Sequence, residues 1–203
     1  MKKAARKPRL RAANVERKTR ETDIKLSLDL DGDGRSQVKT GIGFFDHMLT
    51  ALATHARFDL RVRCRGDLHV DAHHSVEDVG IAFGQALRQA LGDKKGVVRF
   101  GHAYVPLDEA LSRCVVDLSG RGWLQYDVPF RAKQVGAMPT ELFEDIFWAL
   151  ADHGRLNIHL DLIRGRNAHH IAETLFKATA RALAMAVALD PRVKGVPSTK
   201  GFL

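Results

Sequence analysis

The chain has 203 residues, 45% of them hydrophobic, and a formal net charge of +8. A chain of this length and composition can bury a sizeable core, as one globular unit or as two fused halves. Because no apolar run approaches the roughly 20 residues of a membrane span and the N-terminus lacks the apolar segment of a signal peptide, we expect no membrane role and a cytoplasmic protein. Cys64 and Cys114 lie in apolar runs without metal or disulfide spacing, which is typical of core residues in a reducing compartment.

The positive charge is concentrated in the first 14 residues, which carry six Lys or Arg and no acid. This composition predicts a disordered basic tail over residues 1–14. Subtracting its six charges from +8 leaves about +2 for the rest of the chain. We therefore expect the body of the protein to bind no nucleic acid.

The first half, residues 15–98, combines strand patterns with two helical patterns. Apolar residues alternate at Ile24, Leu26, Leu28 and Leu30, a period of two that indicates a half-buried strand. The Asp-Gly-Asp-Gly sequence at residues 31–34 is typical of a hairpin turn. The expected elements are a strand over 15–30 returning at 36–40, a helix of about twelve residues beginning at 44, strands at 58–64 and 67–70, and a helix at 75–91.

The second half, residues 99–203, repeats this order. The expected elements are strands at 103–106, 113–118 and 123–128, a helix at 140–152, a strand at 156–162 and a helix that ends near 189. Because hairpins dominate the connections, this order favours an α+β sandwich over a doubly wound sheet.

One motif is written twice, as Ala-His-His-Ser-Val-Glu from Ala72 and as Ala-His-His-Ile-Ala-Glu from Ala168. Aligned without gaps, residues 72–91 and 168–187 share eight of 20 positions, and residues 46–58 and 144–156 share five of 13. Alanines are common in helices, but paired histidines and glutamates are not. An internal duplication of roughly 95 residues is the simplest explanation.

The HHxxE pattern suits a divalent metal, because imidazole and carboxylate ligands lie on one helix face at i,i+3 and i,i+4 spacing. Adjacent imidazoles lie about 100° apart around a helix, so the two His of one copy cannot easily chelate one ion. At least two metal sites are expected, with ligands shared between copies or subunits. The duplication also aligns His47 with Asp145, which gives eight candidate donors: His47, His73, His74, Glu77, Asp145, His169, His170 and Glu173.

Five separated motifs from residue 15 to the C-terminus resemble those of the imidazoleglycerol-phosphate dehydratase family. They are the Gly43–Leu49 segment, the two HHxxE copies, Asp117–Arg121 and Pro197–Gly201, with residues 17–22 similar to the family's opening strand. The resemblance implies dehydration of D-erythro-imidazole-glycerol 3-phosphate to imidazole-acetol phosphate in histidine biosynthesis. It further implies two Mn²⁺ ions per active site, a 24-subunit homo-oligomer with metal sites where subunits meet, and halves that each hold a four-stranded sheet and two helices, with the helices packed between the sheets.

The resemblance also implies roles for particular residues. Glu173 is the expected acid/base, with Glu77 and Glu21 as the other candidates. The substrate phosphate and its surroundings are assigned to Arg99, Arg121, Lys177, Ser198, Thr199, Lys200, His55 and Glu21. At position 145 many family members carry a metal-binding His, so the carboxylate of Asp145 is a departure, and a Gln is common where this chain has Ala51.

Three other functions have some support. A di-metal hydrolase would also use His and carboxylate ligands. A ferritin-like shell would be richer in Glu and built from long bundle helices, which the hairpin-rich first 40 residues disfavour. A nucleic-acid module would depend on the basic tail alone.

Overall fold

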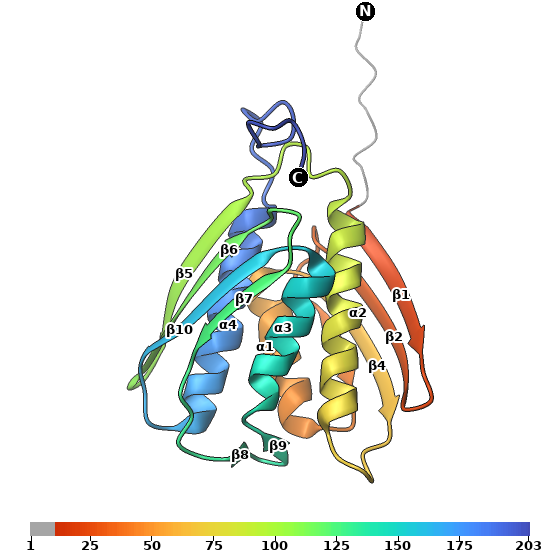
Figure 1. Ribbon diagram of the computed structural model, residues 1–203, viewed down its shortest axis with the longest axis vertical. Coiled ribbons are helices and arrows are strands. Elements are labelled where there is room, and N and C mark those ends of the chain that lie inside the picture. The colour runs from red at the N-terminus through yellow and green to blue at the C-terminus, as the bar shows by residue number, and fades with distance from the viewer. Residues whose placement is uncertain (1–10) are drawn as a thin grey trace, which may run out of the picture.

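The computed structural model describes residues 11–203 of the protein (Figure 1). Two halves follow the same order of elements. The first contains β1 (Ala12–Lys18), β2 (Thr22–Asp29), β3 (Ser36–Lys39), α1 (Gly43–Ala56), β4 (Asp59–Gly66) and α2 (His73–Leu91). The second contains β5 (Phe100–Leu107), β6 (Ala110–Asp117), β7 (Trp123–Asp127), α3 (Leu142–Gly154), β10 (Asn157–Arg164) and α4 (Ala168–Val187), with a small hairpin of β8 (Gln134–Val135) and β9 (Met138–Pro139) before α3.

Each half forms a four-stranded sheet with the same strand order, β1-β2-β4-β3 in the first and β5-β6-β10-β7 in the second. The first two strands of each sheet pair antiparallel, and the third strand of each half pairs parallel with the fourth at the sheet edge. The expected α+β fold and its duplication are confirmed, since both halves have one topology.

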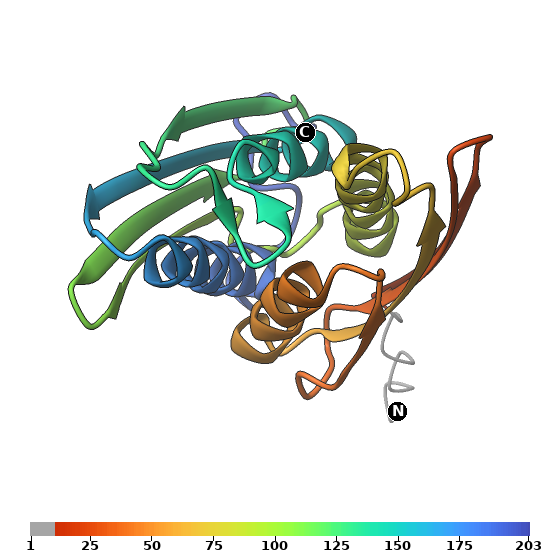
Figure 2. The same ribbon diagram turned by 90° about the horizontal axis from the view of Figure 1, so that it is seen from below.

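The four helices form a layer between the two sheets (Figures 1 and 2). Helix α2 packs on β1 and β2, and α4 packs on β5 and β6. The first helix of each half lies beside the second helix of the other half, so α1 contacts α4 and α3 contacts α2. Residues of the two halves are therefore brought together along both helix pairs.

Two kinds of contact fix the helices. Helices α2 and α3 approach closely at Gly80, where a Cβ atom would lie 2.9 Å from Cβ of Ala149 and 3.0 Å from the carbonyl oxygen of Ile146. Between α3 and α4 the space is filled by buried aromatic rings, since Phe176 lies 5.0 Å from Phe147 between ring centroids. Close contacts of this kind between buried groups hold the helices in fixed relative positions.

The expected hairpin across residues 31–34 is wrong, because β3 pairs with β4 and not with β2. The carboxylate of Asp59, at the start of β4, accepts hydrogen bonds from the backbone N–H groups of Asp33 and Arg35, both at 2.9 Å. These bonds hold the loop against β4, so that the next strand, β3, lies on the side of β4 opposite β2. In the second half β7, the strand expected at 123–128, likewise pairs with the fourth strand of its half, β10.

Two further segments differ from expectation. Residues 15–30 form parts of two strands, with a turn at Thr19 whose hydroxyl oxygen accepts from the N–H groups of Glu21 and Thr22. Residues 67–70 form a turn and not a strand, closed by a 2.8 Å bond from the N–H of Val70 to the carbonyl of Asp67.

The expected tail boundary at residue 14 is also wrong. Strand β1 begins at Ala12, and Arg11 is buried between the carboxylate of Asp31 and the carbonyl of Val187 at the end of α4. Residues 11–14 therefore belong to the first half, and residues 1–10 lie outside the described part of the chain. Across residues 11–203, none of the helices combines the length and apolarity that a membrane crossing needs.

Candidate active site

All four helices begin at one end of the molecule, the lower end in Figure 1. Hydrogen bonds between side chains and backbone hold the starts of α1, α2 and α4, the three helices that carry the expected histidine ligands. The carboxylate of Asp46 accepts from the N–H of Thr40 at 2.8 Å at the start of α1, and that of Asp71 accepts from the N–H of His73 at 2.8 Å at the start of α2. Asn167 caps α4 by accepting from the N–H of His169 at 2.9 Å. Both HHxxE motifs consequently lie in the first helical turns, at the same end.

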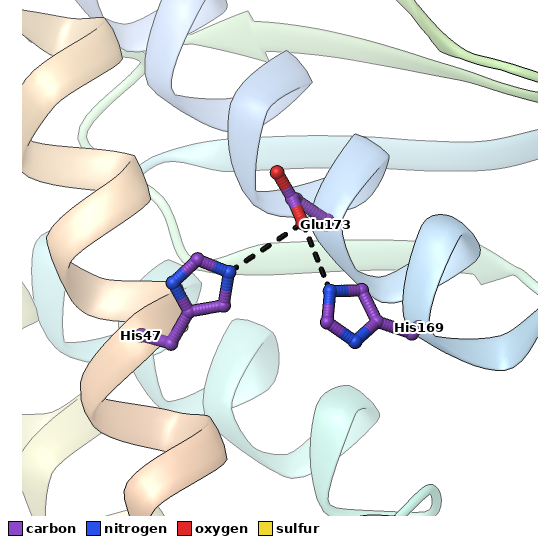
Figure 3. Close-up of side chains that lie close together, drawn as sticks. All are labelled: His47, His169 and Glu173. Carbon is purple, nitrogen blue, oxygen red and sulfur yellow. Dashed lines mark hydrogen bonds and ion pairs between the residues drawn. The ribbon is translucent and has the colours of Figure 1, made fainter.

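The first cluster of candidate ligands is His47, His169 and Glu173 (Figure 3). One oxygen of Glu173 lies 3.1 Å from Nε2 of His169 and 3.5 Å from Nε2 of His47. The three ligand atoms all lie within 4.8 Å of one another. Two imidazoles on α1 and α4 thus converge with a carboxylate, a donor set that fits a divalent transition metal.

Glu173 is ionised in this setting. Burial raises its pKa, but a 2.6 Å ion pair with the ammonium of Lys177 and the bonds from His169 and His47 together lower it to about 2. A carboxylate held this strongly is a good ligand and a weak base. The carboxylate of Glu173 therefore fits a ligand role, and its expected acid/base role stays a prediction.

The second cluster is the counterpart of the first and consists of His73, Glu77 and Asp145. Nδ1 of His73 lies 3.5 Å from the carboxylate of Asp145 on α3, and its Nε2 lies 3.9 Å from that of Glu77. These side chains are between 38% and 46% exposed, whereas that of Glu173 is 15% exposed. The second cluster is therefore looser, and within residues 11–203 only the first brings three ligand atoms within 4.8 Å of one another. Its donor set, one imidazole and two carboxylates, still suits a divalent cation.

The second His of each copy faces away from its neighbour. The rings of His73 and His74 are 6.1 Å apart at 84°, and those of His169 and His170 are 6.2 Å apart at 86°. The two rings of a copy also have different partners, Asp145 and Glu77 for His73 but Asp67 for His74, in agreement with the expectation that adjacent imidazoles do not chelate one ion. His74 and His170 instead point toward the hairpin ends of the two sheets.

Each of these outward histidines contacts a carboxylate through Nδ1. His74 lies 3.0 Å from Asp67, and His170 lies 2.8 Å from Glu109, and these bonds raise the pKa of both imidazoles. The sequence interpretation missed Asp67 and Glu109, although the duplication contained a signal, since Glu109 occupies the hairpin position of Glu21. Glu21 itself lies 3.7 Å from Nε2 of His74.

The expected phosphate ligands lie at the opposite end of the molecule from the helix starts. Arg99 pairs with Asp117 at 2.8 Å and donates to the carbonyl of Pro197 at 2.8 Å, which places it beside the C-terminal segment. Its N–H bonds to the carbonyl of Ala186 at the end of α4, whereas His169 begins that helix. Seventeen residues at about 1.5 Å each separate the two ends by roughly 25 Å. Arg121, Thr199 and Lys200 are exposed near this end, and Ser198 is half-buried.

Lys177 and His55 lie between these two groups. Lys177 is one helical turn beyond Glu173, and its charge together with burial and Arg181 lowers the pKa of His55, with burial the largest cause. The structure therefore brings six of the eight expected metal ligands together in two clusters and leaves His74 and His170 outside them. The expected phosphate ligands form a third group, which lies apart from the metal clusters within one chain.

Comparison with known proteins agrees with the fold. The model of the imidazoleglycerol-phosphate dehydratase family matches residues 40–183. The chain is 61% identical over 194 residues to the imidazoleglycerol-phosphate dehydratase of Gluconobacter oxydans (strain 621H), covering 95% of this chain and 98% of that protein. It is 59% identical over 194 residues to that of Acidiphilium cryptum (strain JF-5), with 95% and 99% coverage.

Solved structures match as well. The Staphylococcus aureus imidazoleglycerol-phosphate dehydratase superposes with a TM-score of 0.81 at 40% identity, covering 88% of this chain and 99% of that one. The Pyrococcus furiosus protein, solved in complex with (S)-C348, gives 0.82 at 37% identity, with 93% and 100% coverage. A duplicated α+β fold that matches dehydratases along nearly the full length of the chain makes this protein an enzyme of the water-eliminating class. More particularly, it belongs to the imidazoleglycerol-phosphate dehydratase family.

Proposed function

We propose that this enzyme dehydrates D-erythro-imidazole-glycerol 3-phosphate to imidazole-acetol phosphate in histidine biosynthesis, using two Mn²⁺ ions per active site. The relatives' names support the substrate. One observation supports the metal: the first helix of each half, which bears a candidate ligand, contacts the HHxxE helix of the other half. This arrangement occurs in both helix pairs, α1 with α4 and α3 with α2. We also propose a cytoplasmic location, in keeping with Cys64 and Cys114, which are buried free thiols.

The metal ligands divide between the two clusters. His47, His169 and Glu173 would hold one ion, and His73, Glu77 and Asp145 the other. His74 and His170 face away from both clusters, so each would complete a cluster in a neighbouring subunit and give every ion four protein donors. Bound Mn²⁺ supplies a Lewis acid that lowers the pKa of the substrate imidazole.

The reaction removes a hydroxyl from the carbon attached to the imidazole and a proton from the next carbon, and the enol that remains becomes the ketone. We propose Glu21 as the residue that takes the proton. Glu173 is engaged by Lys177 and two histidines, and its pKa of about 2 makes it a weak base. Glu21 is half-exposed on the β1–β2 turn, 3.7 Å from the outward His74. Its position suits a group that meets substrate.

The position of the expected phosphate ligands supports a site formed between subunits. Arg99, Arg121 and Lys200, with Ser198 and Thr199, would bind the phosphate through bidentate and hydroxyl contacts. Because this group lies roughly 25 Å along α4 from the metal clusters, we propose that a neighbouring subunit supplies it. The homo-oligomer of 24 subunits expected from the family would provide such neighbours.

The experiment follows the product and the metal together. Purified protein would be stripped with a chelator, assayed for imidazole-acetol phosphate, and assayed again after Mn²⁺ is restored. We expect activity to disappear and return, with no inorganic phosphate released. Phosphate release would favour the di-metal hydrolase, and a dehydration rate that survives complete chelation would overturn the metal proposal.

A further inference from the structure

Both outward histidines are held in the same way by residues without an assigned role. Nδ1 of His74 lies 3.0 and 3.2 Å from the two oxygens of Asp67, and Nδ1 of His170 lies 2.8 Å from Oε2 of Glu109. The carboxylates of Asp67 and Glu109 are 18% and 28% exposed, so both bonds are partly shielded from water. In each half, the second His of the motif is bonded through the same ring nitrogen.

The two halves reach this arrangement from different places in the duplicated fold. Glu109 lies on the β5–β6 turn, whose counterpart in the first half is the β1–β2 turn with Glu21. Asp67 follows β4 directly, whereas its counterpart β10 is followed by Gly165, Arg166 and Asn167, none of which is acidic. Because carboxylates at two non-equivalent positions make the same contact with Nδ1, the contact is not a remnant of the duplication. It indicates that each histidine needs a carboxylate at Nδ1.

Additional bonds fix these carboxylates. The other oxygen of Glu109 accepts from the N–H groups of Arg166 and Asn167 at 3.1 and 2.8 Å, and Asn167 caps the helix that carries His170. The N–H of Asp67 donates to the carbonyl of Glu21 at 3.1 Å. The carboxylate of Glu109 is thus anchored to the backbone just before its histidine, and the backbone of Asp67 is tied to the β1–β2 turn.

We propose that Asp67 and Glu109 are positioning residues that make Nε2 the metal-binding atom of His74 and His170. An imidazole that donates Nδ1–H to a carboxylate keeps its lone pair on Nε2 and has a fixed ring orientation. Nε2 of each ring then faces outward, away from the HHxxE cluster of its own chain. This inference rests on the proposed function, because it concerns the same Mn²⁺ ions.

The arrangement also gives different roles to the two hairpin glutamates, Glu109 and Glu21. In the second half the hairpin residue, Glu109, is occupied with positioning His170. In the first half Asp67 does this work, which leaves Glu21 near Nε2 of His74 and available to the substrate. One member of the duplicated pair therefore orients a ligand, and the other can exchange protons.

The test is Mn²⁺ binding to the metal-free full chain, measured by calorimetry on wild type, Asp67→Asn and Glu109→Gln. Both substitutions keep the shape but allow an amide N–H to face Nδ1, which favours the wrong tautomer. We expect 10- to 100-fold weaker binding for the affected ion. Asp23→Asn is the matched control, since it removes the same charge from an exposed strand position and should bind as wild type does.

The thermal midpoint of each metal-free variant separates positioning from folding, and we expect it to match that of wild type. Because Asp67 and Glu109 lie on different elements, each variant tests the inference independently of the other. Wild type that binds Mn²⁺ while both variants bind it within twofold would overturn the inference and leave the proposed function standing. Wild type that binds no Mn²⁺ would overturn both.

Discussion

The contact between α2 and α3 at Gly80 should be intolerant of a single methyl group. A Cβ atom there would lie 2.9 Å from Cβ of Ala149 and 3.0 Å from the carbonyl of Ile146, and ordinary contacts begin at 3.4 Å. The helices must therefore separate by about 0.5 Å or distort. Overpacking of this kind costs about 1–3 kcal/mol. At roughly 2–4 °C per kcal/mol for a chain of this size, Gly80→Ala should lower the midpoint of thermal unfolding by several degrees.

The displacement should also reach the second cluster. Asp145 begins the turn of α3 that contacts Gly80, and its partner His73 lies two turns before Gly80 on α2. We expect calorimetry to show weaker Mn²⁺ binding at one of two sites. Gly43→Ala is the matched control, because nothing lies within 4 Å of a Cβ at that position. If Gly80→Ala melts within 1 °C of wild type, the packing argument is wrong.

Three further changes test separate parts of the account. Glu21→Gln should lower kcat by about 10²- to 10⁴-fold while Mn²⁺ content stays unchanged, and normal turnover would remove Glu21 as the proton acceptor. Arg121→Ala should raise KM with little change in kcat, because a phosphate contact binds substrate and transition state alike; an unaltered KM would contradict the phosphate role. In metal-free protein, Lys177→Met should destabilise the fold near neutral pH. Because the folded pKa of Glu173 is lowered from 4.5 to about 2, this difference should be full above pH 4.5 and shrink as pH falls toward 2, which urea unfolding at several pH values would detect.

The duplicated α+β fold and the cluster residues could be predicted because the chain repeats a rare motif. Helix and strand periodicity placed most elements within a few residues, from local patterns alone. The sequence predicted one set of eight ligands shared between copies or subunits. It did not predict that His47 would lie beside the second HHxxE copy and Asp145 beside the first. The exchange of first helices between halves, which creates those pairs, is a property of tertiary packing.

Other features depend on contacts that no local pattern records. The Asp31–Gly34 segment has hairpin composition, but the carboxylate of Asp59 draws the following strand to β4. Arg11 belongs to an unbroken basic run and yet is buried by Asp31 and the end of α4. Asp67 and Glu109 belong to no local motif; the duplication relates Glu109 to Glu21, but the contacts of both residues with histidine nitrogens come from the tertiary structure.

The most direct measurement is the number of Mn²⁺ ions bound per chain after reconstitution of wild type, His169→Ala and His73→Ala. Each substitution removes an imidazole from one cluster and leaves the other intact. We predict two ions for wild type and one for each variant, with dehydration lost in both. Wild type that turns over substrate with no bound metal, or variants that keep both ions, would contradict the account.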